Sequence, residues 1–128
     1  IGWAYENRTS AIRIPASGPK ARRIEHRVAG GDVNPYLTLA AILGAALNGI
    51  EDATEPPAPV SGNAYEQGLE QLPATWAEAI DSFAGSAEIR RIFPAHLVEN
   101  FVMTKRQELH YMAELSDEET VELYLDTV

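Results

Sequence analysis

The sequence contains no cysteine, which excludes a disulfide scaffold and any zinc site with cysteine ligands. It also lacks an apolar run of the roughly 18 residues that a membrane-spanning helix needs, so we predict no contact with a membrane. Basic residues are scarce: ten lysines and arginines stand against 19 aspartates and glutamates, for a formal net charge of −9. That charge argues against nucleic acid as a partner. The absence of cysteine fits a reducing compartment, and we predict a cytoplasmic protein.

What remains is the composition of an ordinary globular protein. The chain has 128 residues, of which 45% are hydrophobic and 23% are charged. This length corresponds to one domain with one core. No Walker loop or dinucleotide-binding glycine motif is present, so any nucleotide is expected to lie on a sheet rather than in a glycine-rich loop.

The few basic residues are unevenly distributed. Residues 1–27 hold six of the ten, against two acidic residues, which gives this segment a net charge of +4. The remainder holds four basic and seventeen acidic residues, a net charge of −13. The clustering is either a chance feature of a solvated surface or an anion site. Five of the six basic residues in the segment are arginines, whose fork of donors suits phosphate and carboxylate.

Two segments near the start of the chain alternate between apolar and polar residues. Residues 11–15 and 21–28 show this period of two, and Ser17-Gly18-Pro19 between them has the composition of a turn. We therefore predict a β-hairpin over about residues 11–28, with two antiparallel strands.

The second predicted strand places charged side chains in a row. Arg23, Glu25 and Arg27 share one face, with about 6.5–7 Å between successive side chains, and Arg13 can join them from the first strand. On a solvated face this row is an ion-pair ladder of little energetic value. In a cleft, the carboxylate can bind a divalent cation while the arginines bind anionic oxygens, a combination suited to phosphoryl transfer.

Helices are predicted for most of the remaining chain, so the fold class is α+β. Asn34-Pro35 begins an uncharged helix over 34–50, predicted to be buried, although the chain can hardly supply neighbours for all its faces. Residues 51–73 are rich in proline and glycine and predict a loop, and 74–128 predict a helical body with capping boxes at Thr75 and Ser116. The apolar stripes of that body are Trp76, Ile80 and Phe83; Ile89, Ile92 and Phe93; Leu97, Val98, Phe101, Val102, Leu109 and Met112; and Val121, Tyr124, Leu125 and Val128.

Three ordered blocks within the first 37 residues resemble the glutamine synthetase family. They are ENRTSAIRIP (residues 6–15), KARRIEHR (20–27) and GDVNPYL (31–37). The resemblance implies that this chain corresponds to the C-terminal part of that family's catalytic domain, with residues 1–30 as arginine-rich strands that line the site. It also implies a ring-shaped homo-oligomer.

The resemblance assigns roles to six residues. Arg8 is implied to contact the transferred phosphoryl group, the nucleotide and the glutamate side chain, and Arg27 to hold the γ-carboxylate of glutamate and then the acyl phosphate. Both are therefore implied to be catalytic and substrate-binding. Arg13, Lys20 and Arg23 are implied to bind the nucleotide phosphates. Glu25 is implied to be a ligand of a divalent metal ion, Mg²⁺ or Mn²⁺.

The implied reaction is an ATP-dependent ligation. The γ-carboxylate of glutamate attacks the γ-phosphate of ATP, and ammonia then displaces phosphate from γ-glutamyl phosphate to form glutamine. The family's other metal ligands precede the first of the three blocks. We therefore interpret residues 1–128 as a segment of a longer enzyme and predict that this segment alone is inactive.

Two alternatives remain open. In the first, the chain resembles a γ-glutamylpolyamine synthetase-like member, and the acceptor is a polyamine or another amine. In the second, it is a non-catalytic anion-binding or interaction domain.

Overall fold

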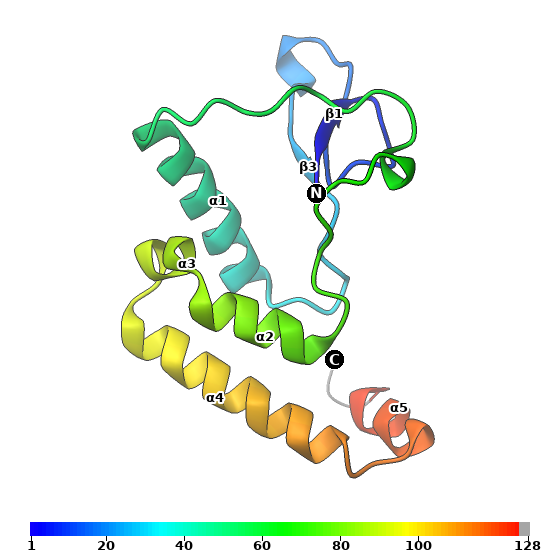
Figure 1. Ribbon diagram of the computed structural model, residues 1–128, viewed down its shortest axis with the longest axis vertical. Helices are drawn as coiled ribbons and strands as arrows, with labels where there is room; N and C mark the ends of the chain where they lie inside the picture. Colours follow the sequence, from blue (N-terminus) through cyan, green and yellow to red (C-terminus); the bar gives the residue numbers. More distant parts are fainter. Residues whose placement is uncertain (126–128) are drawn as a thin grey trace. The chain divides into compact units, whose positions relative to one another are not determined.

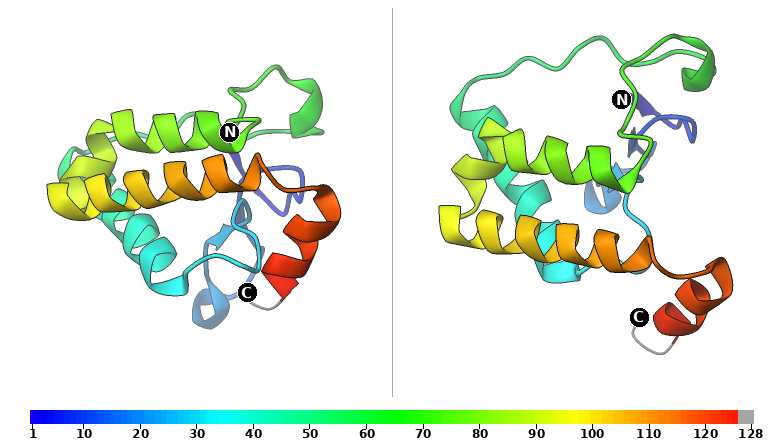
Figure 2. Two further views of the ribbon diagram at one scale, coloured as in Figure 1. Left: turned by 90° about the horizontal axis from the view of Figure 1, so that it is seen from below. Right: turned by 60° about the horizontal axis from the view of Figure 1, so that its bottom comes forward.

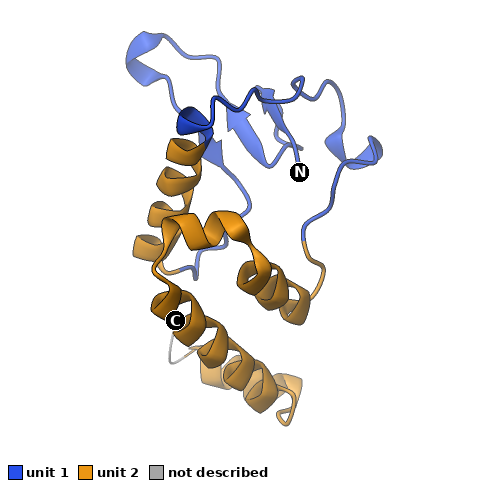
Figure 3. Ribbon diagram, turned by 60° about the vertical axis from the view of Figure 1, so that its left-hand side comes forward, with its two compact units in different colours: residues 1–33, 49–72 blue, residues 34–48, 73–128 orange. Residues whose placement is uncertain are grey.

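The computed structural model describes residues 1–125 and confirms the α+β class. Val128, which the sequence places on the last apolar stripe, lies outside the described residues. The chain forms two compact units, coloured separately in Figure 3. The first unit combines residues 1–33 with 49–72, and the second combines residues 34–48 with the chain from residue 73 onward.

The first unit contains a three-stranded sheet in the order β1-β2-β3. The strands are β1 (Trp3–Tyr5), β2 (Ile12–Ile14) and β3 (Glu25–His26). β2 and β3 are antiparallel, with Arg13 opposite Glu25, which confirms the predicted hairpin. β1 pairs with β2 in parallel and was not predicted, because three residues are too few to show a period of two.

The second arm of the hairpin is shorter than the alternation suggests. The sequence predicts a strand over 21–28, whereas only Glu25 and His26 pair with β2. Pro19 begins a short 3₁₀ helix, η1 (Pro19–Ala21), and Arg22 has an extended backbone without a pairing partner. Alternation alone therefore overestimated how much of this arm joins the sheet.

The segment after α1 (Pro35–Glu51) forms the predicted loop and packs on the sheet of its own unit. The Trp3 indole nitrogen donates to the carbonyl of Pro57 at 2.7 Å, and the Val60 amide donates to the carbonyl of Trp3 at 2.8 Å. Further along, the loop forms the 3₁₀ helix η2 (Ala64–Glu66), where Ala64 is buried. These contacts join the loop to the strand that the sequence did not reveal.

The second unit is helical. Besides most of α1 it contains α2 (Trp76–Gly85), α3 (Ala87–Ile92), α4 (Ala95–Met112) and α5 (Asp117–Leu125). α2 and α4 lie side by side (Figures 1 and 2). The core consists of predicted stripe residues: Ile80, Phe93, Val98 and Val102 are buried there. None of the described helices is both long and apolar enough to cross a bilayer.

The helix starts follow the predicted capping signals. The Asn34 side-chain oxygen accepts from the amides of Tyr36 and Leu37 at 3.0 and 3.1 Å. Thr75 opens α2 in a complete capping box with Glu78. The Ser116 hydroxyl accepts from the Glu119 amide at 3.3 Å, while the Glu119 carboxylate accepts from the Ser116 amide at 2.8 Å. Local side-chain chemistry therefore fixes where these helices begin.

α1 differs from the predicted buried helix. Leu37 and Ala41 pack against the helical core. Its Tyr36 and Leu43 are nevertheless 83% and 68% exposed, and of its side chains only Asn48 is buried. The other helices of the unit cover one side of α1, so the apolar residues on its remaining surface stay exposed.

Candidate functional site

Three of the predicted site residues form one ion-pair cluster on the hairpin. The Arg13 Nε and Nη2 atoms both lie 2.7 Å from Glu25 Oε2. Arg23 donates from Nε at 3.1 Å and from Nη2 at 2.9 Å to Glu25 Oε1. The hydrogen bond from Arg13, with support from Arg23, holds the pKa of the Glu25 carboxyl below its usual value of 4.5. Glu25 is thus a carboxylate held between two guanidinium groups.

The hairpin register explains this cluster. Arg13 and Glu25 are directly opposite one another on β2 and β3, so their side chains leave the same face of the sheet. Arg23 precedes Glu25 by two residues and reaches the same face. The predicted alternation therefore correctly brought Arg23 and Glu25 together, and Arg13 joins them from β2 as expected. The prediction was wrong for Arg27, which does not join this cluster and lies at another pocket.

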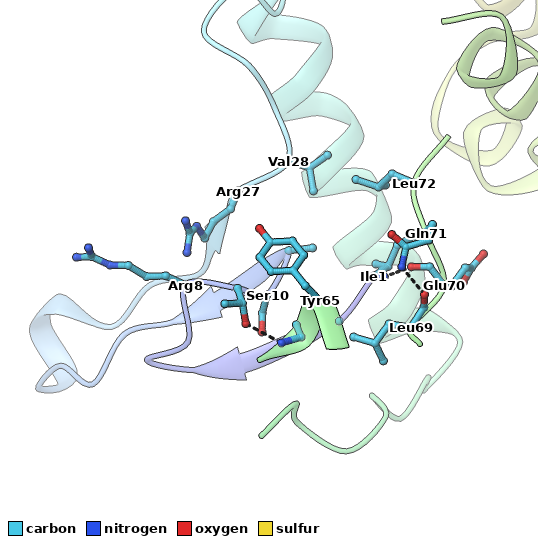
Figure 4. A pocket seen from close by; sticks show the side chains of 14 residues that line it. Ile1, Arg8, Ser10, Arg27, Val28, Tyr65, Leu69, Glu70, Gln71 and Leu72 are labelled. Carbon is cyan, nitrogen blue, oxygen red and sulfur yellow. Dashed lines mark hydrogen bonds between the residues drawn. The ribbon is translucent and has the colours of Figure 1, made fainter. Parts of the chain in front are cut away.

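Arg8 and Arg27 lie at a separate pocket of about 410 Å³ in the same unit. In Figure 4 both arginines lie on one side of the Tyr65 ring, with Val28 and Leu72 on its other side. Within residues 1–125, neither guanidinium forms a hydrogen bond or an ion pair with another side chain. The pocket lining also includes one acidic residue, Glu70. The two guanidinium groups, which have no ion-pair partner among the described residues, nevertheless suit an anionic ligand.

Hydrogen bonds from the residues on either side of Arg8 hold one wall of this pocket. The Asn7 oxygen accepts from the amide and hydroxyl of Thr9 at 2.9 and 2.7 Å, and the Asn7 nitrogen donates to the carbonyl of Gly62 at 2.7 Å. The Thr9 hydroxyl oxygen in turn accepts from the Ala64 amide at 2.9 Å. Asn7 and Thr9 thus attach the segment that carries Tyr65 to the start of the arginine-rich region.

Two pocket residues were not predicted as site residues. Tyr65 is 80% exposed and lies on η2, which is far from Arg8 in the sequence. Ser10 is only 3% exposed, and its hydroxyl has no hydrogen-bond partner among the described residues. Buried hydroxyls are normally paired with protein or water. The nearby Asn-Arg-Thr block marks this region, but no local pattern identifies Ser10 or Tyr65.

Lys20 does not join either group of residues. It lies on η1, where it lines a shallow hollow with Gly18, Pro19 and Ala21. Across the described chain its ammonium group has no hydrogen bond or ion pair. Its predicted contact with a nucleotide therefore stays a prediction.

Residues 1–125 do not by themselves complete a site for a divalent cation. Glu25 is the single carboxylate of the ion-pair cluster, and both of its oxygens already accept hydrogen bonds from arginine. No set of three or more carboxylate or imidazole groups placed to hold a metal occurs within residues 1–125. What the two groups of arginines do fit is an anion with several oxygens.

Comparisons with known proteins indicate the family to which this chain is related. The model of the "Glutamine synthetase, catalytic domain" family matches residues 1–124. Gamma-glutamylethanolamide synthetase GlnA4 of Streptomyces coelicolor is 38% identical over 109 residues, which is 85% of this chain and 23% of that protein. The glutamine synthetase of Methanocaldococcus jannaschii is 36% identical over 116 residues, 84% of this chain and 26% of that protein. Glutamate–isopropylamine ligase of a Pseudomonas species is 36% identical over 129 residues, 98% of this chain and 28% of that protein.

A solved structure supports the same relationship. The structure of apo GmaS without ligand superposes with a TM-score of 0.76 at 32% sequence identity, and covers 93% of this chain and 28% of that chain. The chain thus spans about a quarter of the length of the relatives it matches. Together with the match to the family model, these relationships show that the chain belongs to the glutamine synthetase family.

Proposed function

We propose that this chain is the C-terminal segment of the catalytic domain of an ATP-dependent carbon–nitrogen ligase. In this proposal it supplies the anion-binding wall of the active site. The observation that carries the proposal is the pocket in which Arg8 and Arg27 lie without a side-chain partner among residues 1–125. A reaction that moves a phosphoryl group onto a carboxylate needs such positive groups where negative charge develops.

In this proposal the arginines bind two different ligands, glutamate and the nucleotide. Arg8 and Arg27 bind the γ-carboxylate of glutamate and orient it towards the γ-phosphate of ATP. Arg13 and Arg23 bind the nucleotide phosphates, with Lys20 at the edge of the site. The carboxylate oxygen attacks the phosphorus, ADP leaves, and an amine then displaces phosphate from γ-glutamyl phosphate. The family relationship supports Mg²⁺ or Mn²⁺ as a further component, for which Glu25 is the candidate ligand in this chain. We assign the metal no step, because residues 1–125 do not complete a site for it.

The acceptor is ammonia in the leading version of the proposal, so that the product is glutamine. Two of the relatives support an amine as the alternative acceptor, since one is named for ethanolamide synthesis and another for isopropylamine. The discriminating measurement is product formation by the full-length protein with ammonia, ethanolamine, isopropylamine and putrescine as competing acceptors.

A pair of arginine variants tests the proposed site in the full-length protein. We expect Arg27→Ala to lower glutamate-dependent phosphate release from ATP by at least about 100-fold, since removing one group that stabilises transition-state charge costs this much in other enzymes. Arg22→Ala is the matched control, because Arg22 is an exposed arginine of the same segment that does not line the pocket. Equal activity in both variants would contradict the role of Arg27.

The same assay tests whether the segment suffices for catalysis. We expect residues 1–128 on their own to form no amide from glutamate, ATP and ammonia, because their described part holds no set of three groups placed to bind a metal ion. ATP-dependent amide formation by this isolated segment would show that the segment proposal is wrong.

A further inference from the structure

We propose that Glu6 is a positioning residue, which fixes the turn that carries Arg8 and so determines where the Arg8 guanidinium meets its anionic ligand. Glu6 itself is not among the described residues that line the pocket. The inference rests on the proposed function for the role of Arg8. For the role of Glu6 it rests on the backbone and the hydrogen bonds of residues 6–16.

The first argument is the backbone conformation of Glu6. Its φ is 52°, in the left-handed region, and among the described residues Ala53 is the only other non-glycine residue with a positive φ. A residue with a Cβ atom is strained in this region, and the conformation persists only where the surrounding structure imposes it. Ala53 ends a helix, where a left-handed residue is common. Glu6 instead follows β1 directly and precedes Arg8 by two residues.

The second argument is the pair of hydrogen bonds that impose this conformation. The Glu6 amide donates to the carbonyl of Ile14 at 3.2 Å, which continues the pairing of β1 with β2. The Glu6 carboxylate accepts from the amide of Ala16, just beyond the end of β2. The backbone and the side chain of Glu6 are thus both attached to the end of the neighbouring strand.

The third argument is the short connection between the two strands. β1 and β2 pair in parallel, with Trp3 opposite Ile12, so residues 6–11 alone return the chain from the end of β1 to the start of β2. Parallel strands normally need about a dozen or more residues for such a connection. The short return requires a sharp change of direction at its first residue, which is the left-handed Glu6. Arg8 lies within this return.

The position of Arg8 depends on the backbone that carries it. Its guanidinium has no side-chain partner among residues 1–125, so no other side chain holds it in place. On one side of the turn, Asn7 and Thr9 form hydrogen bonds with the segment that carries Tyr65. On the other side, the Glu6 carboxylate attaches the turn to the residue after β2 and its neighbour. Without that carboxylate, side chains would anchor the turn on one side alone.

Glutamate-dependent phosphate release by the full-length protein tests this inference. We expect Glu6→Ala to lower kcat/KM for glutamate by about 10- to 100-fold, since a misplacement of about 1 Å in a site can cost this much. Part of the loss should be a higher KM for glutamate, because Arg8 is proposed to bind that substrate. Glu6→Gln should keep most of the activity, because its amide oxygen can still accept from the Ala16 amide. Loss of folded protein alone would lower kcat and leave KM unchanged.

Two glycine variants separate positioning from stability. Glu6→Gly should melt at a higher temperature than Glu6→Ala, because glycine adopts a positive φ without steric cost, and yet be no more active. Ala53→Gly is the matched control, since it replaces the other described left-handed residue at a position that does not line the pocket. It should melt above the unaltered protein and keep its kcat and KM. A purely structural role of Glu6 would instead make activity follow the melting temperature.

The outcomes separate this inference from the proposed function. If the unaltered full-length protein is active and both Glu6→Ala and Glu6→Gly keep its KM for glutamate, the positioning role is wrong while the proposed function stands. The positioning role is also wrong if Glu6→Gln loses as much activity as Glu6→Ala, since the hydrogen bond to the Ala16 amide is then not what matters. If the unaltered protein releases no phosphate in response to glutamate, both the proposed function and the inference fail.

Discussion

At the end of α1, Ala53 has a φ of 49°, in the left-handed region where an alanine costs about 1–2 kcal/mol. Two hydrogen bonds impose this conformation. The Thr54 amide donates to the carbonyl of Gly49 at 2.9 Å, and the Ala53 amide donates to that of Ile50 at 3.2 Å. This pattern is a Schellman motif, whose left-handed position is usually glycine.

We expect Ala53→Gly to raise the free energy of unfolding by about 1 kcal/mol, because glycine adopts this conformation without steric cost. Thermal unfolding followed by circular dichroism measures the change. Ala46→Gly, on an exposed position within α1, is the control and should lower stability by about 0.5–1 kcal/mol. If Ala53→Gly also destabilises the chain, the left-handed strain at residue 53 is not relieved by glycine.

Gly44 of α1 lies close to the side chain of Ile92 on α3. A Cβ atom added there would lie 2.6 Å from Ile92 Cγ2 and 2.8 Å from its Cγ1. Because Ile92 packs against the helical core, it has little freedom to move away. A side chain at position 44 would therefore clash with Ile92 unless α1 and α3 moved apart locally.

Gly44→Ala should therefore destabilise the second unit by about 1–3 kcal/mol, the usual cost of overpacking. This would outweigh the preference of a helix for alanine over glycine. Urea unfolding measures the loss. Gly85→Ala is the comparison, since an added Cβ there meets nothing within 4 Å and should leave stability unchanged or slightly higher. A Gly44→Ala variant as stable as the unaltered chain would show that α1 and α3 can separate at little cost.

A hydrogen bond from Tyr124 of α5 reaches the carboxylate of Glu108 on α4. Glu108 accepts from Lys105 Nζ at 2.6 Å and from the Tyr124 hydroxyl at 2.8 Å. The hydrogen bond from Lys105 is the main cause that lowers the pKa of Glu108 below its usual 4.5, with Tyr124 contributing and partial burial opposing. Because the charged form is favoured in the folded state, this contribution is complete above the unfolded-state pKa and is lost as the pH falls through the folded-state value.

We expect the melting temperature to fall below about pH 4.5, with part of that fall absent in Glu108→Gln. At pH 7 the variant should be less stable by under about 1 kcal/mol, since the ion pair is partly exposed. Melting curves at pH 7 and pH 3 measure both effects, with Glu99→Gln on the same helix as the control. Identical pH profiles for Glu108→Gln and the unaltered chain would contradict the role of Glu108.

Over the whole chain, short sequence patterns correctly predicted the features that depend on neighbouring residues in the sequence. The caps at Asn34, Thr75 and Ser116 and the buried stripe of α4 follow from spacing alone, and so does the face shared by Arg23 and Glu25. The pairing of β1 with β2 depends on contacts between separate segments, which no short pattern encodes. The same holds for the hydrogen bonds that bring Tyr65 to Arg8. Val121 and Leu125 of α5, predicted as an apolar stripe, are 57% and 75% exposed, because a stripe shows the capacity to pack and not the presence of a neighbour.

The division into two units has a consequence for how this chain can be cut. The polypeptide passes from one unit to the other after residues 33, 48 and 72, so neither unit is a continuous stretch of sequence. A protease that cleaves the exposed loop at Glu55 would separate the sheet strands from residues 56–72 of their own unit. Each of the two products would nevertheless contain residues of both units. They are joined through the passage after residue 33 in the first product and through the passage after residue 72 in the second. A gene truncation at any of the three passages would likewise leave at least one unit incomplete. Neither unit can therefore be produced as a continuous chain without residues of the other.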